Sequence, residues 1–335
     1  MEQIGQSQLI GKGGYGCAFT PPLKCRKSKL KTQSRVVGKI MKKDDAEIEL
    51  NISTVIKGIP GYERYFIIQE EDNCNSRNFK KIRKTYSTMC SPIREIQDKD
   101  MIQLVSKYGG KSLHNISITE SFNFMGSFKH VLEGVYKLNK QGVCHLDLKA
   151  DNMLVDMYGT IRIIDFGISF LGDMSTEQTV REHQFPFSPE YNAFPPELAV
   201  QEGIVKGMSL SYAIQQSIIQ KKIFITAASL LGLSIRDQEN SLRKFWEQDP
   251  VWMETGGKTW AKWFRTYWRA WDSWAIGVVF LKLLEKCLLI PSFINGEWMN
   301  HRETIVIVLK GLLQANPNMR LTSEEALKII SEADS

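Results

Sequence analysis

With 335 residues, 43% of them hydrophobic and 24% charged, the chain has the composition of a folded globular protein and the length for two lobes or domains. The N-terminus lacks the basic-then-apolar pattern of a signal peptide, and no apolar run reaches the roughly 18–20 residues that a membrane span needs. Six scattered cysteines without a CxxC pair predict neither a zinc site nor a disulfide framework, so we expect a reduced intracellular compartment.

Positive charge is concentrated in the first third of the chain. Residues 1–110 hold 20 Lys/Arg and 12 Asp/Glu, a net charge of +8, whereas the remainder has a net charge of −2. The excess lies at Lys24–Arg35 and Lys80–Lys84. Such runs can bind nucleic acid, a membrane surface or an acidic partner, but neither contains the interleaved aromatics that stack on bases. We interpret both as solvated loops and expect no nucleic-acid or membrane binding.

Four glycines stand near the start of the chain, within the segment Gln8–Phe19: Gly11, Gly13, Gly14 and Gly16. Apolar residues flank them on both sides, which predicts two strands joined by a loop whose backbone N–H groups can approach phosphate oxygens. A dinucleotide-binding turn would need a helix directly after the glycines. Pro21 and Pro22 block such a helix, so the sequence favours strand–loop–strand.

A strand predicted at residues 36–41 carries Lys39 among apolar neighbours. A lysine there needs a charged partner, because burying the ammonium alone is expensive. The helix predicted at residues 44–57 offers Glu47 and Glu49. Glu49 is better placed, since isoleucines three and seven positions later would share its helix face.

The next segments predict short strands and one long helix. An apolar run at 65–68 predicts a strand, 70–84 a polar loop, and 101–105 a further strand that ends before Gly109-Gly110, where we place the boundary between two lobes. An amphipathic helix is predicted at 121–142. Its apolar face and the glycine that ends it are Phe124, Phe128, Val131, Leu132, Val135, Leu138 and Gly142.

The stretch His145–Gly167 contains the densest group of polar residues suited to chemistry. Two short apolar strands joined by a Tyr-Gly-Thr turn predict a hairpin, which would bring Asp147 and Asp165 to face one small volume. Lys149 and Asn152 lie between them. Carboxylates and an amide oxygen are hard ligands suited to Mg²⁺, and a lysine can neutralise phosphate charge. The stretch therefore indicates phosphoryl transfer.

In this order along the chain, the motifs resemble those of the eukaryotic-type protein kinases. They are the glycine-rich GKGGYG at 11–16, Lys39 with a helix glutamate, His145–Asn152 as the catalytic loop, Asp165-Phe166-Gly167 as the magnesium motif, Pro195-Pro196-Glu197 as the end of the activation segment, Asp272–Gly277 as the start of the central helix, and Asn316–Arg320, whose arginine would pair with Glu197. The compact chain is also similar in style to kinases encoded by large DNA viruses.

The resemblance implies an α+β, bilobal protein-kinase-like fold. A small β-rich N-lobe would occupy residues 1–106, a hinge 107–111, and a larger, mostly helical C-lobe 112–335. Within the C-lobe, the activation segment would span 165–197 and a helical insert about 198–271.

The resemblance also implies a role for each residue. Asp147 would accept or orient the proton of the substrate hydroxyl, and Lys149 would steady the γ-phosphate. Asn152 and Asp165 would hold two Mg²⁺ ions, while Lys39, fixed by Glu49, would contact the α- and β-phosphates of ATP. The ATP-binding residues implied are Ile10, Gly11, Gly13, Gly14, Gly16, Ala18, Val37, Lys39, Lys107, Gly109 and Leu154.

Three positions bear on substrate and regulation. Lys149, two residues after Asp147, resembles serine/threonine rather than tyrosine kinases, and Ser188 stands where such kinases keep a hydroxyl that contacts the catalytic loop. Leu146 replaces the arginine that in many kinases receives an activation-loop phosphate. We therefore expect activity that does not need phosphorylation of this loop.

The distance from Glu197 to Asp272 is longer than is usual between these motifs, and the insert is rich in tryptophan: Trp246, Trp252, Trp260, Trp263, Trp268 and Trp271. Aromatics at helical spacing favour core packing in a helix that leads into the central helix. The alternatives are a surface for a protein partner, or stacking on nucleic acid helped by four basic residues, Lys258, Lys262, Arg265 and Arg269.

The sequence thus predicts an intracellular protein kinase, located in host cytoplasm, nucleus or virion if the source is viral, that uses ATP and Mg²⁺ to phosphorylate serine or threonine. Its expected partners are ATP and a protein substrate. One alternative is a pseudokinase scaffold that binds ATP and acts through the insert, although the set Lys39, Asp147, Asn152 and Asp165 is complete. A kinase of small molecules or lipids is the third interpretation.

Overall fold

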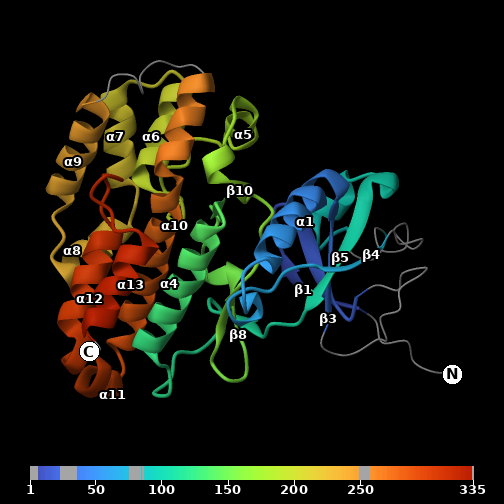
Figure 1. The fold of residues 1–335 in the computed structure, drawn as a ribbon, viewed down its shortest axis with the longest axis horizontal. Coiled ribbons are helices and arrows are strands. Elements are labelled where there is room, and N and C mark those ends of the chain that lie inside the picture. Colours follow the sequence, from blue (N-terminus) through green and yellow to red (C-terminus); the bar gives the residue numbers. More distant parts are fainter. Residues whose placement is uncertain (1–6, 23–35, 75–83, 85–86, 249–256, 334–335) are drawn as a thin grey trace. The chain divides into compact units, whose positions relative to one another are not determined.

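The computed structural model describes residues 7–22, 36–74, 84, 87–248 and 257–333 (Figure 1). The chain divides into two compact units: a first unit of residues 1–110 with 164–167, and a second unit of residues 111–163 with 168–335. A β-sheet region is followed by a mostly helical region, as the sequence predicts. The lobe limits and the hinge remain predictions. Among the described residues, no helix is long and apolar enough to cross a membrane.

The first unit is built on a five-stranded antiparallel sheet with the order β1-β2-β3-β5-β4. The strands are β1 (Gln8–Lys12), β2 (Gly16–Thr20), β3 (Val36–Lys42), β4 (Glu70–Cys74) and β5 (Met101–Lys107), and the helices are α1 (Lys43–Lys57), η1 (Tyr62–Arg64), α3 (Ser91–Glu95) and η2 (Asp98–Asp100). Helix α1 packs against β3 and β5, and its buried face includes Glu49. The strand–loop–strand prediction for the glycine segment is confirmed.

The strand predicted at residues 65–68 is wrong. The edge strand of this region is β4, in the stretch expected to be a polar loop, where Glu70 pairs with Val105 of β5. Within 65–68 only Phe66 makes a β-bridge, and it is an isolated one. Tyr65 and Phe66 are 3% and 1% exposed, so their apolar character mainly reflects burial in the core.

The expectation that the cysteines form no disulfide framework is wrong for one pair, whereas Cys144 and Cys287 are free thiols. Cys17 of β2 and Cys90, which precedes α3, form a disulfide with a Cα–Cα distance of 6.3 Å. Both are fully buried in a hydrophobic cluster with Phe19, Ile40 and Ile93. The two residues are 73 positions apart, so no local spacing could indicate the pair. The disulfide removes one support for a reduced compartment.

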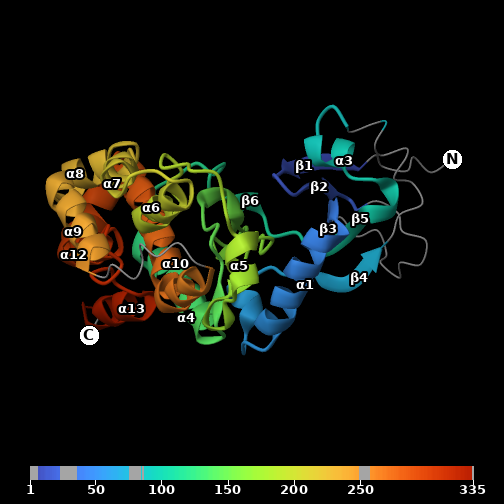
Figure 2. The same ribbon diagram turned by 90° about the horizontal axis from the view of Figure 1, so that it is seen from above.

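The second unit contains short strands and most of the helices (Figures 1 and 2). The strands are β6 (Lys111–Ser112), β7 (Val143–Cys144), β8 (Met153–Val155), β9 (Ile161–Ile163) and β10 (Phe170–Leu171). The helices are α4 (Phe124–Lys140), η3 (Ala150–Asn152), η4 (Gly172–Met174), α5 (Glu177–Glu182), α6 (Pro196–Val205), α7 (Leu210–Ile219), α8 (Ile223–Leu231), α9 (Ile235–Gln248), α10 (Gly257–Cys287), α11 (Pro291–Phe293), η6 (Ile294–Trp298), α12 (Met299–Leu312) and α13 (Ser323–Ala333).

Two sequence-local predictions in this unit are confirmed. Helix α4 begins after Asn123, whose side chain accepts a hydrogen bond from the Gly126 N–H at 2.6 Å, and it buries the predicted apolar face. Strands β8 and β9 form the predicted hairpin. In its turn, Asp156 accepts hydrogen bonds from the N–H groups of Tyr158 and Thr160 at 2.9 and 3.0 Å, while Gly159 has a φ of 82°.

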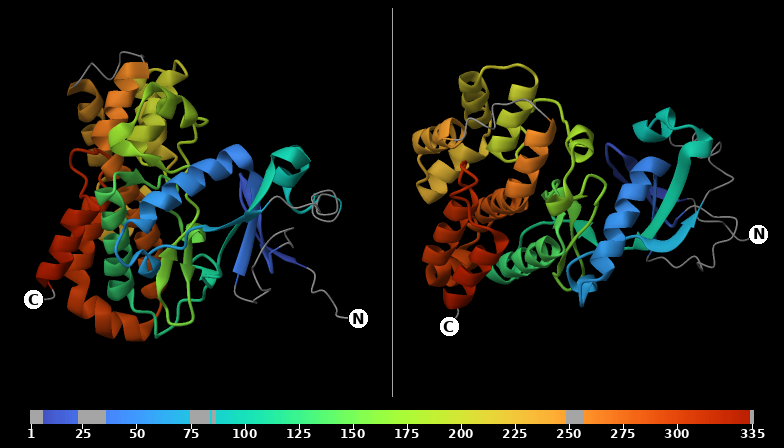
Figure 3. Two further views of the ribbon diagram at one scale, coloured as in Figure 1. Left: turned by 45° about the vertical axis from the view of Figure 1, so that its right-hand side comes forward. Right: turned by 45° about the horizontal axis from the view of Figure 1, so that its top comes forward.

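Helix α10 is the central helix of this unit, and several other helices pack against it. Its 31 residues continue through Asp272 without a break, so the tryptophan-rich end of the insert and the predicted central helix are one element. It packs against α4, α5, α8 and α12, and Figure 3 shows the yellow-to-orange helices α6–α9 gathered together. The buried aromatics of this core include Trp246, Trp260, Trp263, Phe264, Trp268, Trp271 and Trp274, each at most 3% exposed. Core packing is therefore the correct interpretation of the described tryptophans; Trp252 lies outside the described residues.

Candidate active site

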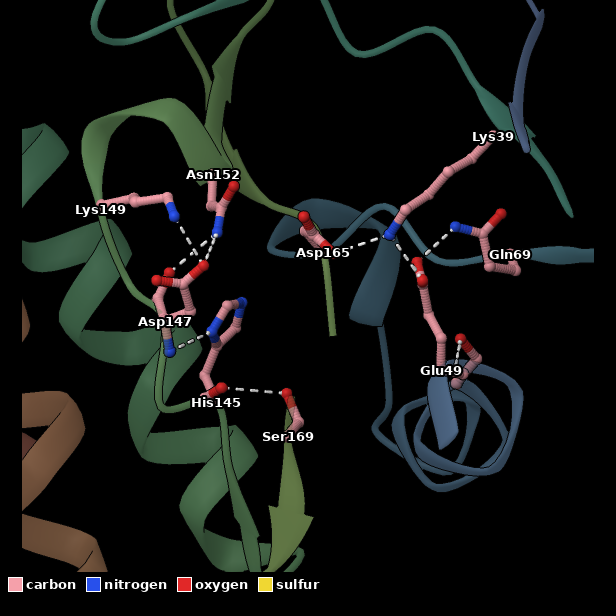
Figure 4. Close-up of polar contacts among 10 residues, drawn as sticks. Lys39, Glu49, Gln69, His145, Asp147, Lys149, Asn152, Asp165 and Ser169 are labelled. Carbon is pink, nitrogen blue, oxygen red and sulfur yellow. Dashed lines mark hydrogen bonds and ion pairs between the residues drawn. The ribbon is translucent and has the colours of Figure 1, made fainter. Parts of the chain in front are cut away.

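The predicted lysine–glutamate pair forms in the first unit (Figure 4). Lys39 Nζ on β3 lies 2.7 Å from Glu49 Oε2 on α1 and 2.7 Å from Asp165 Oδ1. Of the two glutamates considered, Glu49 is buried and Glu47 is exposed. Burial disfavours the ammonium of Lys39, but the charges of Glu49 and Asp165 outweigh it and raise the Lys39 pKa. The lysine is therefore a fixed positive charge.

Gln69 completes this group, and sequence reasoning missed it. Its Nε2 donates a hydrogen bond to Glu49 Oε1 at 2.6 Å, so that each carboxylate oxygen of Glu49 has its own donor (Figure 4). Glu49 is 1% exposed, and a buried carboxylate needs such partners. The only signal in the sequence is a polar residue directly after the apolar run at 65–68.

Asp165 has an unusual backbone. Its φ is 68°, in the left-handed region that non-glycine residues seldom adopt. The next residue, Phe166, is 1% exposed and packs edge-on against Phe66, with ring centroids 6.1 Å apart. The buried ring and the Lys39 contact together hold the aspartate in this conformation.

In the second unit, the carboxylate of Asp147 has partners on both of its oxygens. Oδ2 accepts hydrogen bonds from Lys149 Nζ at 2.7 Å and Asn152 Nδ2 at 3.0 Å (Figure 4), and Oδ1 accepts one from the Tyr191 hydroxyl. Lys149 Nζ lies 3.3 Å from the same hydroxyl. These three side chains determine the direction in which the carboxylate points.

Tyr191 is the second functional residue that sequence reasoning missed. Ser188 was the expected hydroxyl near the catalytic loop, but the contact is made by Tyr191, three residues later. Ser188 instead accepts the Tyr191 N–H at its backbone oxygen, at 3.0 Å, in the turn that presents the phenol. Burial and the negative charge of Asp147 raise the Tyr191 pKa to about 12, so the phenol remains a hydrogen-bond donor.

The backbone before Asp147 is held by a buried carboxylate. Asp272 on α10 accepts hydrogen bonds from the N–H groups of His145 and Leu146 at 2.8 and 2.9 Å. Burial raises the Asp272 pKa, and these two bonds oppose that effect. Leu146 has a φ of 68°, rare for a bulky residue, so Asp272 stabilises a strained turn. The side chain of Leu146 is 3% exposed and lies in the apolar core.

His145 makes contacts within this turn and with Ser169, the residue before β10. Its Nδ1 accepts the Asp147 N–H at 3.2 Å, and its backbone oxygen accepts the Ser169 hydroxyl at 3.1 Å (Figure 4). Because Nδ1 accepts, the ring proton of a neutral His145 resides on Nε2.

Helix α10 also binds residues 173–175, in the stretch that the sequence predicts to be the activation segment. Asp173 accepts hydrogen bonds from Trp268 Nε1 at 3.1 Å and from Arg269 at 2.7 Å, and Arg269 stacks over the Trp268 ring at 4.3 Å. Arg265 donates to the backbone oxygen of Ser175. We call these contacts the α10 clasp; they hold the segment with an unmodified aspartate.

The predicted pair of Glu197 and Arg320 is confirmed. The two side chains make parallel hydrogen bonds of 2.7 Å each and have no exposed surface. Arg320 also stacks over Trp274 at 5.3 Å. A bidentate pair in this environment joins the first turn of α6, where the predicted activation segment ends, to the helical core.

The residues expected to contact the nucleotide are placed on several elements, and their roles remain predictions. Ile10 and Gly11 lie on β1, Gly13 and Gly14 in the loop, Gly16 and Ala18 on β2, Val37 on β3, Lys107 at the end of β5, Gly109 after it, and Leu154 on β8. A Cβ atom at Gly16 would collide with the backbone of Ile40, so this glycine is required by the close approach of β2 and β3.

Comparison with known proteins identifies the family of this chain. The protein kinase domain model matches residues 4–209, more than half of the chain, and the chain belongs to this family. It is 39% identical to the serine/threonine-protein kinase PTK2 of Candida glabrata over 77 residues, which are 23% of this chain and 9% of that protein.

Two further relatives match longer stretches. Identity is 33% over 141 residues with the CBL-interacting serine/threonine-protein kinase 17 of Arabidopsis thaliana, covering 40% of this chain and 30% of that protein. Identity is 24% over 188 residues with the cell division control protein 7 of Schizosaccharomyces pombe, covering 56% of this chain and 16% of that protein. The chain thus spans less than a third of the length of each of these relatives.

Proposed function

We propose that this protein is an active protein kinase that transfers the γ-phosphate of ATP to serine or threonine hydroxyls of a protein substrate. The observation that carries the proposal is the group around Asp147, in which a lysine, an amide and a phenol orient one partly exposed carboxylate. A carboxylate held in this way is suited to accept or orient the proton of an incoming hydroxyl.

The other residues would bind the phosphates of ATP or neutralise the charge of the transferred phosphoryl group. Lys39 would contact the α- and β-phosphates, and Lys149, beside Asp147, would neutralise charge on the transferred phosphoryl group. The glycine-rich loop would offer backbone N–H groups to the phosphates. Each set is built within its own unit, so each can be tested by substitutions that leave the other intact.

We propose Asn152 and Asp165, each considered within its own unit, as magnesium ligands. Asn152 uses its amide nitrogen for Asp147, at 2.9 and 3.0 Å, so its carbonyl oxygen remains available as a metal ligand, and Asp165 would supply a carboxylate. Mg²⁺ commonly uses only one or two protein oxygens together with waters and substrate phosphates. When bound, the ion supplies charge stabilisation of the transferred phosphoryl group.

Specificity for serine or threonine is the finer part of the proposal. It is supported by Lys149, by a hydroxyl contact to the catalytic loop, here from Tyr191, and by relatives whose names describe serine/threonine-protein kinases. A viral source is proposed only because the compact chain is similar in style to kinases encoded by large DNA viruses.

Activity without phosphorylation of the activation segment is also proposed. Leu146, where many kinases carry a phosphate-binding arginine, is apolar and buried. The α10 clasp supplies an alternative anchor, because Asp173 already engages Trp268 and Arg269. A segment held by a carboxylate needs no added phosphate to be ordered.

A pseudokinase that binds ATP without transfer is the second candidate. It is favoured by the large insert, on which a protein partner remains a proposal, and disfavoured by the complete set of charged residues. A kinase of small molecules or lipids is disfavoured by the buried Glu197–Arg320 pair at the end of a protein-kinase-like activation segment.

The test uses the purified chain with Mg²⁺, labelled ATP and a generic basic protein. We expect label on serine or threonine, and its loss in Asp147→Asn. Asp151→Asn, which changes an exposed aspartate of the same loop, is the matched control and should keep activity. Thermal stabilisation by ATP without transfer in the wild-type chain would instead identify a pseudokinase.

A further inference from the structure

A lysine from the insert lies fully buried beneath the turn that carries Tyr191. Lys221, between α7 and α8, has no exposed surface, and its Nζ donates a hydrogen bond to the backbone oxygen of Tyr191 at 2.8 Å. Burial lowers the Lys221 pKa to about 7, against the opposing charges of Glu197, Glu202 and Glu190. Buried lysines are rare because the desolvation of the ammonium is costly, so the position calls for an explanation.

The hydrogen bond goes to a carbonyl and not to a carboxylate. Glu202 on α6 is 3% exposed, and by hydrogen-bond geometry neither of its carboxylate oxygens has a partner among the described residues, although the backbone of Ser188 and the charges of Lys221 and Lys206 lie near enough to lower its pKa. Burial raises the Glu202 pKa to about 8. A lysine retained only to neutralise Glu202 would be expected within hydrogen-bond distance of it. Lys221 instead reaches the substrate-side turn.

That turn is held at two successive carbonyls by side chains from outside it. Lys221 binds the oxygen of Tyr191, and Trp274 Nε1 on α10 binds the oxygen of Asn192 at 2.8 Å. The Tyr191 ring packs edge-on against Phe194, with centroids 4.9 Å apart. Because the backbone and the ring of Tyr191 are both held, its hydroxyl is directed toward Asp147 and Lys149.

We infer that Lys221 is a positioning residue: by holding the Tyr191 carbonyl, it sets the phenol against Asp147 Oδ1 and thereby the orientation of the carboxylate that receives the acceptor hydroxyl. The inference rests on the proposed function. It gives a residue of the predicted insert a role in orienting the carboxylate of Asp147. The path runs from Lys221 to Tyr191 to Asp147, through contacts that all lie within the second unit.

The kinetic test compares Lys221→Met with Lys222→Met. Methionine removes the donor while filling the buried space, and Lys222 is the exposed neighbour that serves as the matched control. We expect kcat to fall about tenfold in Lys221→Met with the KM for ATP unchanged, because a hydrogen bond that orients a charged group has been released. Lys222→Met should match the wild type.

A double-mutant cycle separates positioning from general destabilisation. Tyr191→Phe removes only the hydroxyl and should lower kcat by a similar factor. If Lys221 acts through the phenol, Lys221→Met should add little to Tyr191→Phe, whereas independent effects would multiply. Wild-type kcat in Tyr191→Phe, or multiplied losses in the double variant, would overturn the inference.

A readout that needs no activity is the titration of Tyr191 by ¹³C NMR of ring-labelled tyrosine, assigned with Tyr191→Phe. In the wild-type chain the Tyr191 pKa is raised to about 12, and in Lys221→Met it should fall toward 10.0 as the phenol leaves Asp147. An unchanged titration would contradict the inference. If the wild-type chain transfers no phosphate, the proposed function fails, and the titration still decides whether Lys221 positions Tyr191.

Discussion

Lys39 in the first unit and Asp147 in the second are held by opposite means. Lys39 is a cation, 17% exposed, that lies between the carboxylates of Glu49 and Asp165. Asp147 is an anion, also 17% exposed, that is held by an ammonium, an amide and a phenol. The partners of Lys39 keep its charge in place, whereas the partners of Asp147 mainly set a direction.

The difference predicts different consequences of mutation. Removing a partner of Lys39 leaves a largely buried charge uncompensated, so folding and activity should fall together. Removing the Tyr191 hydroxyl leaves Asp147 with Lys149 and Asn152, so activity should fall while folding is retained. Stability is therefore more closely coupled to the chemistry in the first unit than around Asp147.

The largest expected loss of stability comes from a substitution in the second unit, away from Asp147. Arg320→Leu would leave Glu197 as a fully buried carboxylate without its bidentate partner, and we expect a loss of about 3–5 kcal/mol in the free energy of unfolding. Urea denaturation followed by tryptophan fluorescence measures this value. Arg302→Leu, at an exposed position, is the control, and equal losses in the two variants would refute the assignment.

The disulfide tests how the first unit is stabilised. Because Cys17 and Cys90 close a loop across 73 residues, Cys90→Ser should lower the free energy of unfolding by about 2–5 kcal/mol. A reducing agent should destabilise the wild-type chain by a similar amount and have no further effect on Cys90→Ser. Equal midpoints with and without reductant in the wild-type chain would count against a stabilising cross-link.

The coupling around Lys39 is tested with neighbouring glutamates. Glu49→Gln removes the buried charge that faces Lys39, and we expect a loss of about 1–3 kcal/mol in stability together with at least about tenfold lower phosphoryl transfer. Glu47→Gln, two residues away on the exposed face of α1, should change stability by no more than about 0.5 kcal/mol. If Glu49→Gln lost activity without losing stability, the contrast with Asp147 would disappear.

The smallest effects on stability and activity are expected from substitutions in the predicted activation segment. Replacing Ser175, Thr176 and Thr179 together with alanine removes the capping box of α5, which should lower stability by about 1 kcal/mol. Activity should remain within about twofold of the wild type if the α10 clasp and not a phosphate orders the segment. Loss of activity in this folded variant would refute independence from phosphorylation.

The elements that short-range patterns specify were predicted well. The glycine loop, the β8–β9 hairpin and the buried face of α4 each depend on turn residues or on a repeat within one element. Glu49 was preferred over Glu47 on the same ground, because apolar residues at helical spacing show which face of α1 is buried. Such features can be read locally because the backbone geometry itself imposes their period.

The partners that complete each group come from elsewhere in the chain. Gln69 approaches Glu49 from 20 residues away, Tyr191 approaches Asp147 from 44, and Lys221 lies 30 residues beyond Tyr191. The same holds for the Cys17–Cys90 disulfide and for the α10 clasp on Asp173. None of these pairs has a local spacing to reveal it.

The sequence alone therefore determined which residues carry charge at the candidate site and which short elements present them. Only the tertiary structure decided that α10 binds Asp173, that the phenol of Tyr191 and not Ser188 reaches Asp147, and that the buried Lys221 donates a hydrogen bond to the backbone of that tyrosine. The physical reason is that dense packing between distant segments places these side chains, and the burial it creates makes each unpartnered polar group costly.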